Sequence, residues 1–159
     1  MKNCIFILFV VASIVLLDSC KTTEVNCIKP YNQNQIVRWG EYNAKLGNVI
    51  GYQISTDMMI SRIKKDKADT AYSIQEIGKV DPLKYCDIVE MIKYEVLRSQ
   101  AVNAPGELNR FIEYQNPAKN VSVRAMWNSL FNTVGTKGFR EIYDSMMVVS
   151  STGVLPIKK

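Results

Sequence analysis

The sequence contains no histidine among its 159 residues. Histidine is the side chain that most often transfers protons near neutral pH, so its absence excludes Ser-His-Asp and Cys-His catalysis and every metal site that needs imidazole. The sequence also lacks internal repeats, low-complexity runs, and any contiguous basic stripe or aromatic–basic motif of a nucleic-acid surface. The net charge of +5 is spread thinly along the chain. We therefore expect no nucleic-acid partner, no metal and no cofactor.

An apolar run over residues 5–17 follows Lys2 at the N-terminus. It is shorter than a comfortable bilayer span of about 20 residues and has the length of a signal-peptide h-region. The run ends in Leu17-Asp18-Ser19-Cys20. This ending resembles the lipobox of bacterial lipoproteins, in which an aliphatic and a small residue stand three and one positions before an obligatory cysteine. Asp18 departs from the small or apolar residue that is commoner at the middle position.

The lipobox resemblance implies cleavage before Cys20, diacylglyceryl transfer to its thiol, and acylation of the new amine with a fatty acid such as palmitate. Two or three acyl chains hold a protein stably in a bilayer. By the sorting pattern of Gram-negative lipoproteins, Lys21 after the lipidated cysteine favours the outer membrane. We therefore expect a protein of the bacterial cell envelope, bound to the lipid bilayer through acylated Cys20. The alternative is an uncleaved N-terminal anchor with an incidental cysteine.

This organisation leaves about 140 residues after cleavage, enough for one core but not for two. The expected segments are a signal peptide over 1–19, the lipidated cysteine and a tether over 20–35, a domain over 36–149, and a tail over 150–159. In an oxidising compartment the two remaining thiols, Cys27 and Cys86, could form a disulfide. A buried free thiol at Cys86, in the first turn of an expected helix, is the alternative.

Hydrophobic periodicity predicts a single α+β domain in the order β-β-β-α-β-β-α, with antiparallel strands and both helices on one face of the sheet. The expected strands cover residues 49–55, 59–63, 71–80, 108–114 and 121–127. Residues 36–42 could form a further strand, but they show no clear period. One helix is expected from Pro82, after the capping residue Asp81, and another from about Gly138.

Four segments of this domain resemble, in the same order, small uncharacterised bacterial envelope proteins of unassigned activity. The segments are residues 51–54 (GYQI), 77–82 (IGKVDP), 104–108 (APGEL) with 111–113 (FIE), and 139–143 (FREIY). The resemblance implies one compact domain and transfers no catalytic residue. Those proteins favour Asp-Gly at the first hairpin tip, whereas Asp57 is followed here by Met58, which resists the positive φ of a primed turn. We therefore expect a turn that is longer or of another type.

Two patterns could support catalysis without histidine. Residues 61–64 (SRIK) match the S-x-x-K motif of penicillin-recognising enzymes, but they lie in an expected strand and have no companion K-T-G motif. The carboxylates that could form an acid/base pair are Glu90, Glu95, Glu107 and Glu113, and no spacing singles out two of them.

The sequence therefore favours a non-catalytic binding or assembly module whose partner is an unknown envelope protein or glycan. We expect the contact surface on the sheet face that the helices leave uncovered, with Arg110, Ser122 and Arg124 as contributors. The alternative is a small envelope hydrolase that acts on peptidoglycan or glycan through Ser/Lys or through paired carboxylates.

Overall fold

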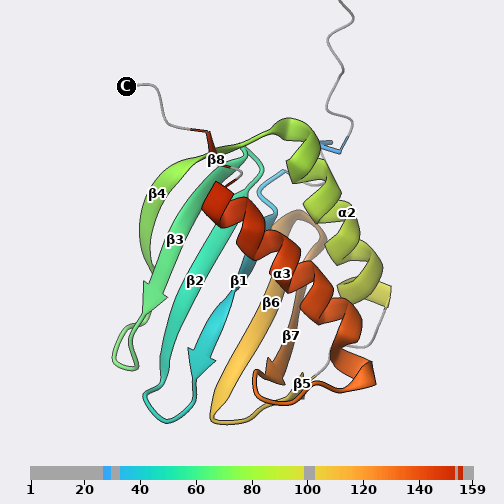
Figure 1. Ribbon diagram of the computed structural model, residues 1–159. Helices are drawn as coiled ribbons and strands as arrows, with labels where there is room; N and C mark the ends of the chain where they lie inside the picture. Colours follow the sequence, from blue (N-terminus) through green and yellow to red (C-terminus); the bar gives the residue numbers. More distant parts are fainter. Residues whose placement is uncertain (1–26, 30–32, 99–102, 153, 156–159) are drawn as a thin grey trace, which may run out of the picture.

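The structure, a computed structural model, describes residues 27–29, 33–98, 103–152 and 154–155. These residues form one eight-stranded sheet in the order β5-β7-β6-β1-β2-β3-β4-β8, with two long helices against one face (Figure 1). Neighbouring strands are antiparallel except for the pair β5 and β7. The strands are β1 (Ile36–Asn43), β2 (Asn48–Ser55), β3 (Met59–Lys65), β4 (Ser73–Val80), β5 (Asn103–Ala104), β6 (Leu108–Asn116), β7 (Val121–Asn128) and β8 (Val154–Leu155); the helices are α2 (Pro82–Arg98) and α3 (Lys137–Thr152). The predicted α+β domain is confirmed.

The predicted strand count before the first helix is wrong, because β1 is a full strand and lies near the middle of the sheet between β2 and β6. Val37 and Trp39 are buried under the helices, while Arg38 is in an ion pair on the other face. The alternation is too short to detect, because Gly40 is buried next to Trp39 and Glu41, in the register of Trp39, is exposed.

Both helices begin close to the predicted residues. At α2, the Asp81 carboxylate accepts the backbone N–H groups of Leu83 and Lys84 at 2.9 and 3.4 Å, which satisfies two of the free amides at the helix start. The core-facing residues of α2 are Tyr85, Ile88, Val89 and Ile92, and those of α3 are Phe139, Ile142, Tyr143 and Met146. They enclose Trp39 and Trp127, which are fully buried between the sheet and the helices.

The predicted tail over residues 150–159 is wrong in its first part. Helix α3 continues to Thr152, and β8 then pairs with the end of β4 through Val80↔Val154 and Lys79↔Leu155. A two-residue edge strand carries no periodic signal, so its pairing is visible only in the fold.

The β2–β3 turn is longer than a two-residue primed turn, as expected, but Met58 does adopt a positive φ of 64°. Three contacts fix this conformation. The Met58 N–H donates to the Ser55 carbonyl at 2.9 Å, and the Asp57 carboxylate accepts the Ser55 hydroxyl and the Met59 N–H. The Met58 side chain packs against the core, which offsets the cost of its backbone conformation.

A disulfide joins Cys27 to Cys86, so the candidate pairing is present in the structure and the free-thiol alternative is wrong. It fastens the segment before β1 to the first turns of α2. Beside it lies a buried hydrogen-bond chain. Gln35 Nε2 donates to the Tyr85 hydroxyl (2.6 Å), the Tyr114 hydroxyl donates to Gln35 Oε1 (3.2 Å), and Asn116 Nδ2 donates to the Tyr114 hydroxyl (3.2 Å). This end of the molecule is therefore held both covalently and by a satisfied polar network.

Candidate binding site on the open face of the sheet

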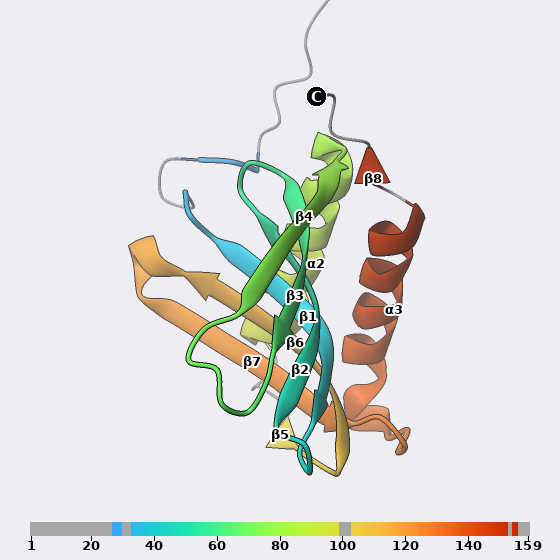
Figure 2. The same ribbon diagram turned by 90° about the vertical axis from the view of Figure 1, so that its left-hand side faces the viewer.

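The face of the sheet away from α2 and α3, here called the open face, is hollow rather than flat. Figure 2 shows the helices on one side of the sheet and the β3–β4 connection bending away from them on the other side. Phe111, Glu113 and Ile63 point to the open face and are nonetheless buried, because the curved sheet and this connection cover them. The curvature brings the end of β3 and the β3–β4 connection toward β7, from which β3 is far in the sheet order.

A charged cluster lies at the centre of the open face. Glu113 Oε1 accepts Arg38 Nη1 at 2.7 Å, and Arg38 Nε donates to Gln53 at 3.2 Å. On the other side, Arg124 Nε stands 3.9 Å from Glu113 Oε2. The Glu113 side chain is only 11% exposed, so its single negative charge is held between two guanidinium groups.

Aromatic rings stack on both guanidinium groups. Arg38 Cζ lies 5.1 Å from the centroid of the Tyr72 ring, and Arg124 Cζ lies 4.3 Å from that of Phe111. These are cation–π distances, and they fix the orientation of both arginines on a sheet surface that would otherwise leave long side chains free.

Next to this cluster is a hollow of about 490 Å³, here called the trough. It lies between the β1–β2 turn, the β3–β4 connection and β7, and its lining includes Tyr42, Val49, Lys65, Lys67, Tyr72, Arg124 and Met126. Cations, tyrosines and apolar side chains therefore meet in one depression of a size that suits a small ligand or the side chain of a partner.

The three residues predicted for the contact surface do not form one surface. Arg124 lines the trough, but Arg110 points to the helix side, where its guanidinium lies 5.0 Å from the Tyr143 ring and 3.8 Å from Asp144. The register explains the error, because Arg110 pairs with Trp127, whose side chain faces the helices. Ser122 lies farther along β7, beside a separate hollow of about 160 Å³.

The candidate catalytic residues are also kept apart. Ser61 is buried, and Lys64, three residues later on the same strand, points to the opposite face. Glu107 and Glu113 are six residues apart on an extended chain, about 20 Å. That separation is too large for either glycosidase geometry. Glu90 and Glu95 border a groove between α2 and α3, and Glu90 is paired with Lys93 at 2.9 Å.

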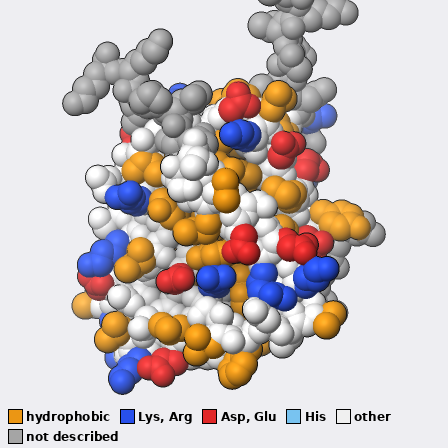
Figure 3. Space-filling view, viewed as in Figure 1, with side chains coloured by type: hydrophobic (Ala, Val, Ile, Leu, Met, Phe, Trp, Pro, Cys, Tyr) orange, Lys and Arg blue, Asp and Glu red, His pale blue; other side chains and the backbone are white. Residues whose placement is uncertain are grey.

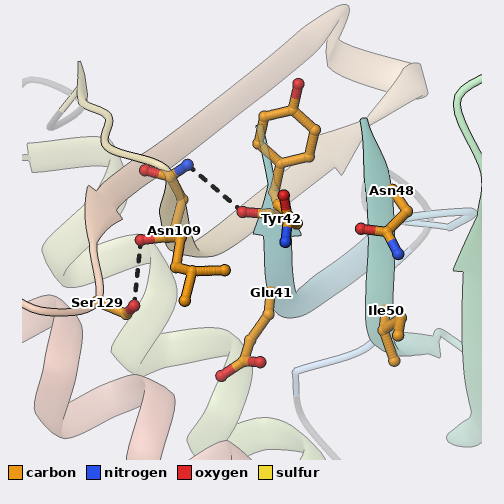
Figure 4. A pocket seen from close by; sticks show the side chains of 8 residues that line it. Glu41, Tyr42, Asn48, Ile50, Asn109 and Ser129 are labelled. Carbon is orange, nitrogen blue, oxygen red and sulfur yellow. Dashed lines mark hydrogen bonds between the residues drawn. The ribbon is translucent and has the colours of Figure 1, made fainter. Parts of the chain in front are cut away.

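A second depression, of about 250 Å³, lies at the end of the sheet formed by the β1–β2 turn (Figure 4). Glu41 and Ile50 point toward it, whereas the Tyr42 ring points the other way, as strand alternation requires. Asn109 Nδ2 donates to the Tyr42 carbonyl at 3.4 Å, and the Ser129 hydroxyl donates to the Leu108 carbonyl at 3.1 Å. Glu41 is the single acidic residue among those that line this hollow, so the hollow does not hold a pair of carboxylates.

Exposed hydrophobic side chains gather at the same end, which is the lower edge of the molecule in Figure 3. They come from the β1–β2 turn, the start of β6 and the β7–α3 connection; we call this the apolar end, and it consists of Leu46, Leu108, Leu130, Phe131 and Val134. Val134 is 93% exposed, so its side chain contributes nothing to the core.

Within the described ranges, no group of three or more histidine, cysteine, aspartate or glutamate side chains could hold a metal. None of the helices in this part of the chain combines the length and the apolar character needed to cross a bilayer. Comparison with protein-family models gives no match to this chain, and comparison with curated proteins gives none either. The lipobox and the resemblance to small envelope proteins therefore stay predictions from the sequence.

Proposed function

We propose that the protein is a lipid-anchored lipoprotein of the bacterial cell envelope, acylated at Cys20, whose domain is a non-catalytic binding or assembly module. The observation that carries the binding role is the trough, which gathers Lys65, Lys67 and Arg124 beside two tyrosines. The support for the location is the sequence Leu17-Asp18-Ser19-Cys20 after a short apolar run. Two observations weigh against the hydrolase alternative: Ser61 and Lys64 lie on opposite faces of β3, and of its carboxylates only Glu90 and Glu95 border the same groove, where Glu90 is paired with Lys93.

The location is tested by feeding cells a clickable fatty acid and comparing the wild-type protein with Cys20→Ala. We expect label on the wild type only, and recovery of the wild type with the outer membrane. Lys21→Asp should keep the label and shift the protein to the inner membrane, following the lipoprotein sorting pattern. Equal labelling of wild type and Cys20→Ala would contradict the lipoprotein assignment.

The binding role is tested by placing a photo-crosslinking residue at Met126 in the trough and, as a control, at Ser145 on α3. We expect an adduct with an envelope protein or glycan from Met126 that Ser145 does not give. A parallel assay should find no turnover of muropeptides or glycans. Turnover that is abolished by Ser61→Ala or Glu107→Gln would replace the binding module with the hydrolase.

A further inference from the structure

Three cationic and two acidic side chains line the trough, and neither acidic side chain forms an ion pair with one of these three cations. Its two acidic residues already have partners: Asp66 is 3.0 Å from Lys64 Nζ, and the Asp69 carboxylate accepts the backbone N–H of Asp66 at 2.9 Å. Lys67, by contrast, has neither an ion pair nor a hydrogen bond from its ammonium to any described residue. Lys65 makes a long hydrogen bond of 3.4 Å to the Thr70 carbonyl and lies 5.8 Å from the centroid of the Tyr72 ring, and it forms no ion pair with a described residue.

The guanidinium group of Arg124 also lacks hydrogen-bond acceptors. Its Nε and Nη2 atoms are buried and make no hydrogen bond to any described residue. Among the described residues, the carboxylate paired with it is Glu113, which is already bound to Arg38 at 2.7 Å and is 3.9 Å from Arg124 Nε, too far for a hydrogen bond. The Arg124 side chain as a whole is 35% exposed, so an anion in the trough can approach a guanidinium group that has no close anionic partner of its own.

The remaining walls of the trough are apolar or aromatic. Val49 and Met126 form part of its surface, and the rings of Tyr42 and Tyr72 border it. At about 490 Å³ the hollow is far larger than an inorganic ion, which occupies little more than the share of one water, about 30 Å³. A ligand that satisfies both parts of this lining carries its charge on a ring or on a short apolar body.

We propose that the trough binds an organic anion, with one carboxylate or phosphate group held by Arg124, Lys65 and Lys67 and a ring or apolar body seated against Tyr72 and Met126. This inference rests on the proposed binding function and names the class of its ligand. A carboxylate and a phosphate offer the same oxygen acceptors, so the experiment separates them.

The test uses the full chain in neutral phosphatidylcholine nanodiscs, with empty nanodiscs subtracted, and measures binding by equilibrium dialysis. The probes are 2-naphthoate, 2-naphthyl phosphate, the uncharged 2-naphthylmethanol, and inorganic phosphate. We expect at least one of the two naphthyl anions to bind tenfold or more tightly than both naphthylmethanol and inorganic phosphate. The preferred anion identifies the head group. Its affinity should fall as salt rises, because the ion pairs are partly exposed.

Two variants and a matched control assign the binding to the trough. Arg124→Gln should weaken binding of the preferred anion by tenfold or more, and Lys67→Gln by about threefold. Arg110→Gln, which removes an arginine from the neighbouring strand on the opposite face, should leave the affinity within twofold. Lys67 is exposed, so its variant keeps the test valid if Arg124→Gln unfolds.

Equal binding of naphthylmethanol and the anions, or unchanged affinity in both trough variants, would overturn the proposal. If no probe binds while the Met126 crosslink still forms, the ligand class is wrong and the binding module stands. If neither occurs, the proposed function fails as well.

Discussion

At the scale of single residues, Glu113 determines the charge of the open face. Its carboxylate lies between Arg38 and Arg124 and is nearly buried. Neither arginine forms an ion pair with another described carboxylate, so one negative charge serves two cations. A buried ion pair is a weak source of stability, but breaking one by removing a single partner is costly. The same residue therefore affects both the stability of the sheet and the charge of the trough.

We predict that Glu113→Gln lowers the free energy of unfolding by about 3 kcal/mol, because it leaves two guanidinium groups without a counter-charge. Urea denaturation measures the change. Glu90→Gln, which breaks an exposed pair with Lys93, is the control and should change stability by less than about 0.5 kcal/mol. The substitution should also raise the affinity of the trough for anions; an equal loss of stability in the two variants would contradict the role assigned to Glu113.

Tyr143 makes the free energy of unfolding depend on pH in the alkaline range. Burial, together with nearby Glu41, raises the pKa of Tyr143 from 10.0 to about 12. The unfolded chain ionises this group near pH 10, so its contribution is fully present below pH 10 and is lost as the pH rises toward 12. We predict that the free energy of unfolding falls across this window and falls less steeply in Tyr143→Phe. Urea titrations at pH 9, 10 and 11 measure the slope, and identical slopes would contradict the prediction.

At the scale of elements, β1 and β2 leave no room for a side chain where Gly40 faces Gly51 on the open side of the sheet. A Cβ added at Gly51 would lie 2.8 Å from the Gly40 Cα, and backbone atoms cannot move aside as a flexible side chain can. The glycine pair allows this contact in the middle of a curved sheet.

We predict that Gly51→Ala lowers the free energy of unfolding by about 2 kcal/mol through this overlap. Gly135→Ala is the matched control, since a Cβ there meets nothing within 4 Å, and it should be neutral. Thermal and urea unfolding of both variants test the difference, and a neutral Gly51→Ala would show that the strands can separate without cost.

The sequence predicts elements with one buried face better than it predicts how they meet. Alternation identified β7, and the Asp81-Pro82 start with its 3.6-residue pattern identified α2. Strand β1 gave no such signal, because the alternation of Val37, Arg38 and Trp39 ends at the exposed Glu41. In the candidate site, Arg124 was predicted as a contact residue and Glu113 only as a catalytic carboxylate. Arg38 and Tyr72 reach the site through register and curvature, which no local pattern encodes.

At the scale of the whole molecule, the Cys27–Cys86 bond closes a loop with a sequence separation of 59. A cross-link over such a loop stabilises a fold by about 4 kcal/mol in the chain-entropy description. We predict that the double variant Cys27→Ala/Cys86→Ala loses up to about this amount in urea denaturation. Dithiothreitol should destabilise the wild type and leave the double variant unchanged, and equal sensitivity of the two proteins would contradict the role of the bond.

The same bond sets how far the domain can stand from a bilayer. For a protein anchored at Cys20, the segment up to the disulfide-bonded Cys27 is seven residues long and spans at most about 25 Å. Without the disulfide, the segment up to Ile36 at the start of β1 could span about 55 Å. Cys27 is bonded to Cys86 near the start of α2, which lies at the opposite end of the sheet from the β1–β2 turn of the apolar end (Figure 1). With the anchor proposed at Cys20, the oxidised protein would hold the start of α2 nearer the membrane and present Leu130, Phe131 and Val134 away from it, whereas reduction would lengthen the connection to about 55 Å and release this restriction.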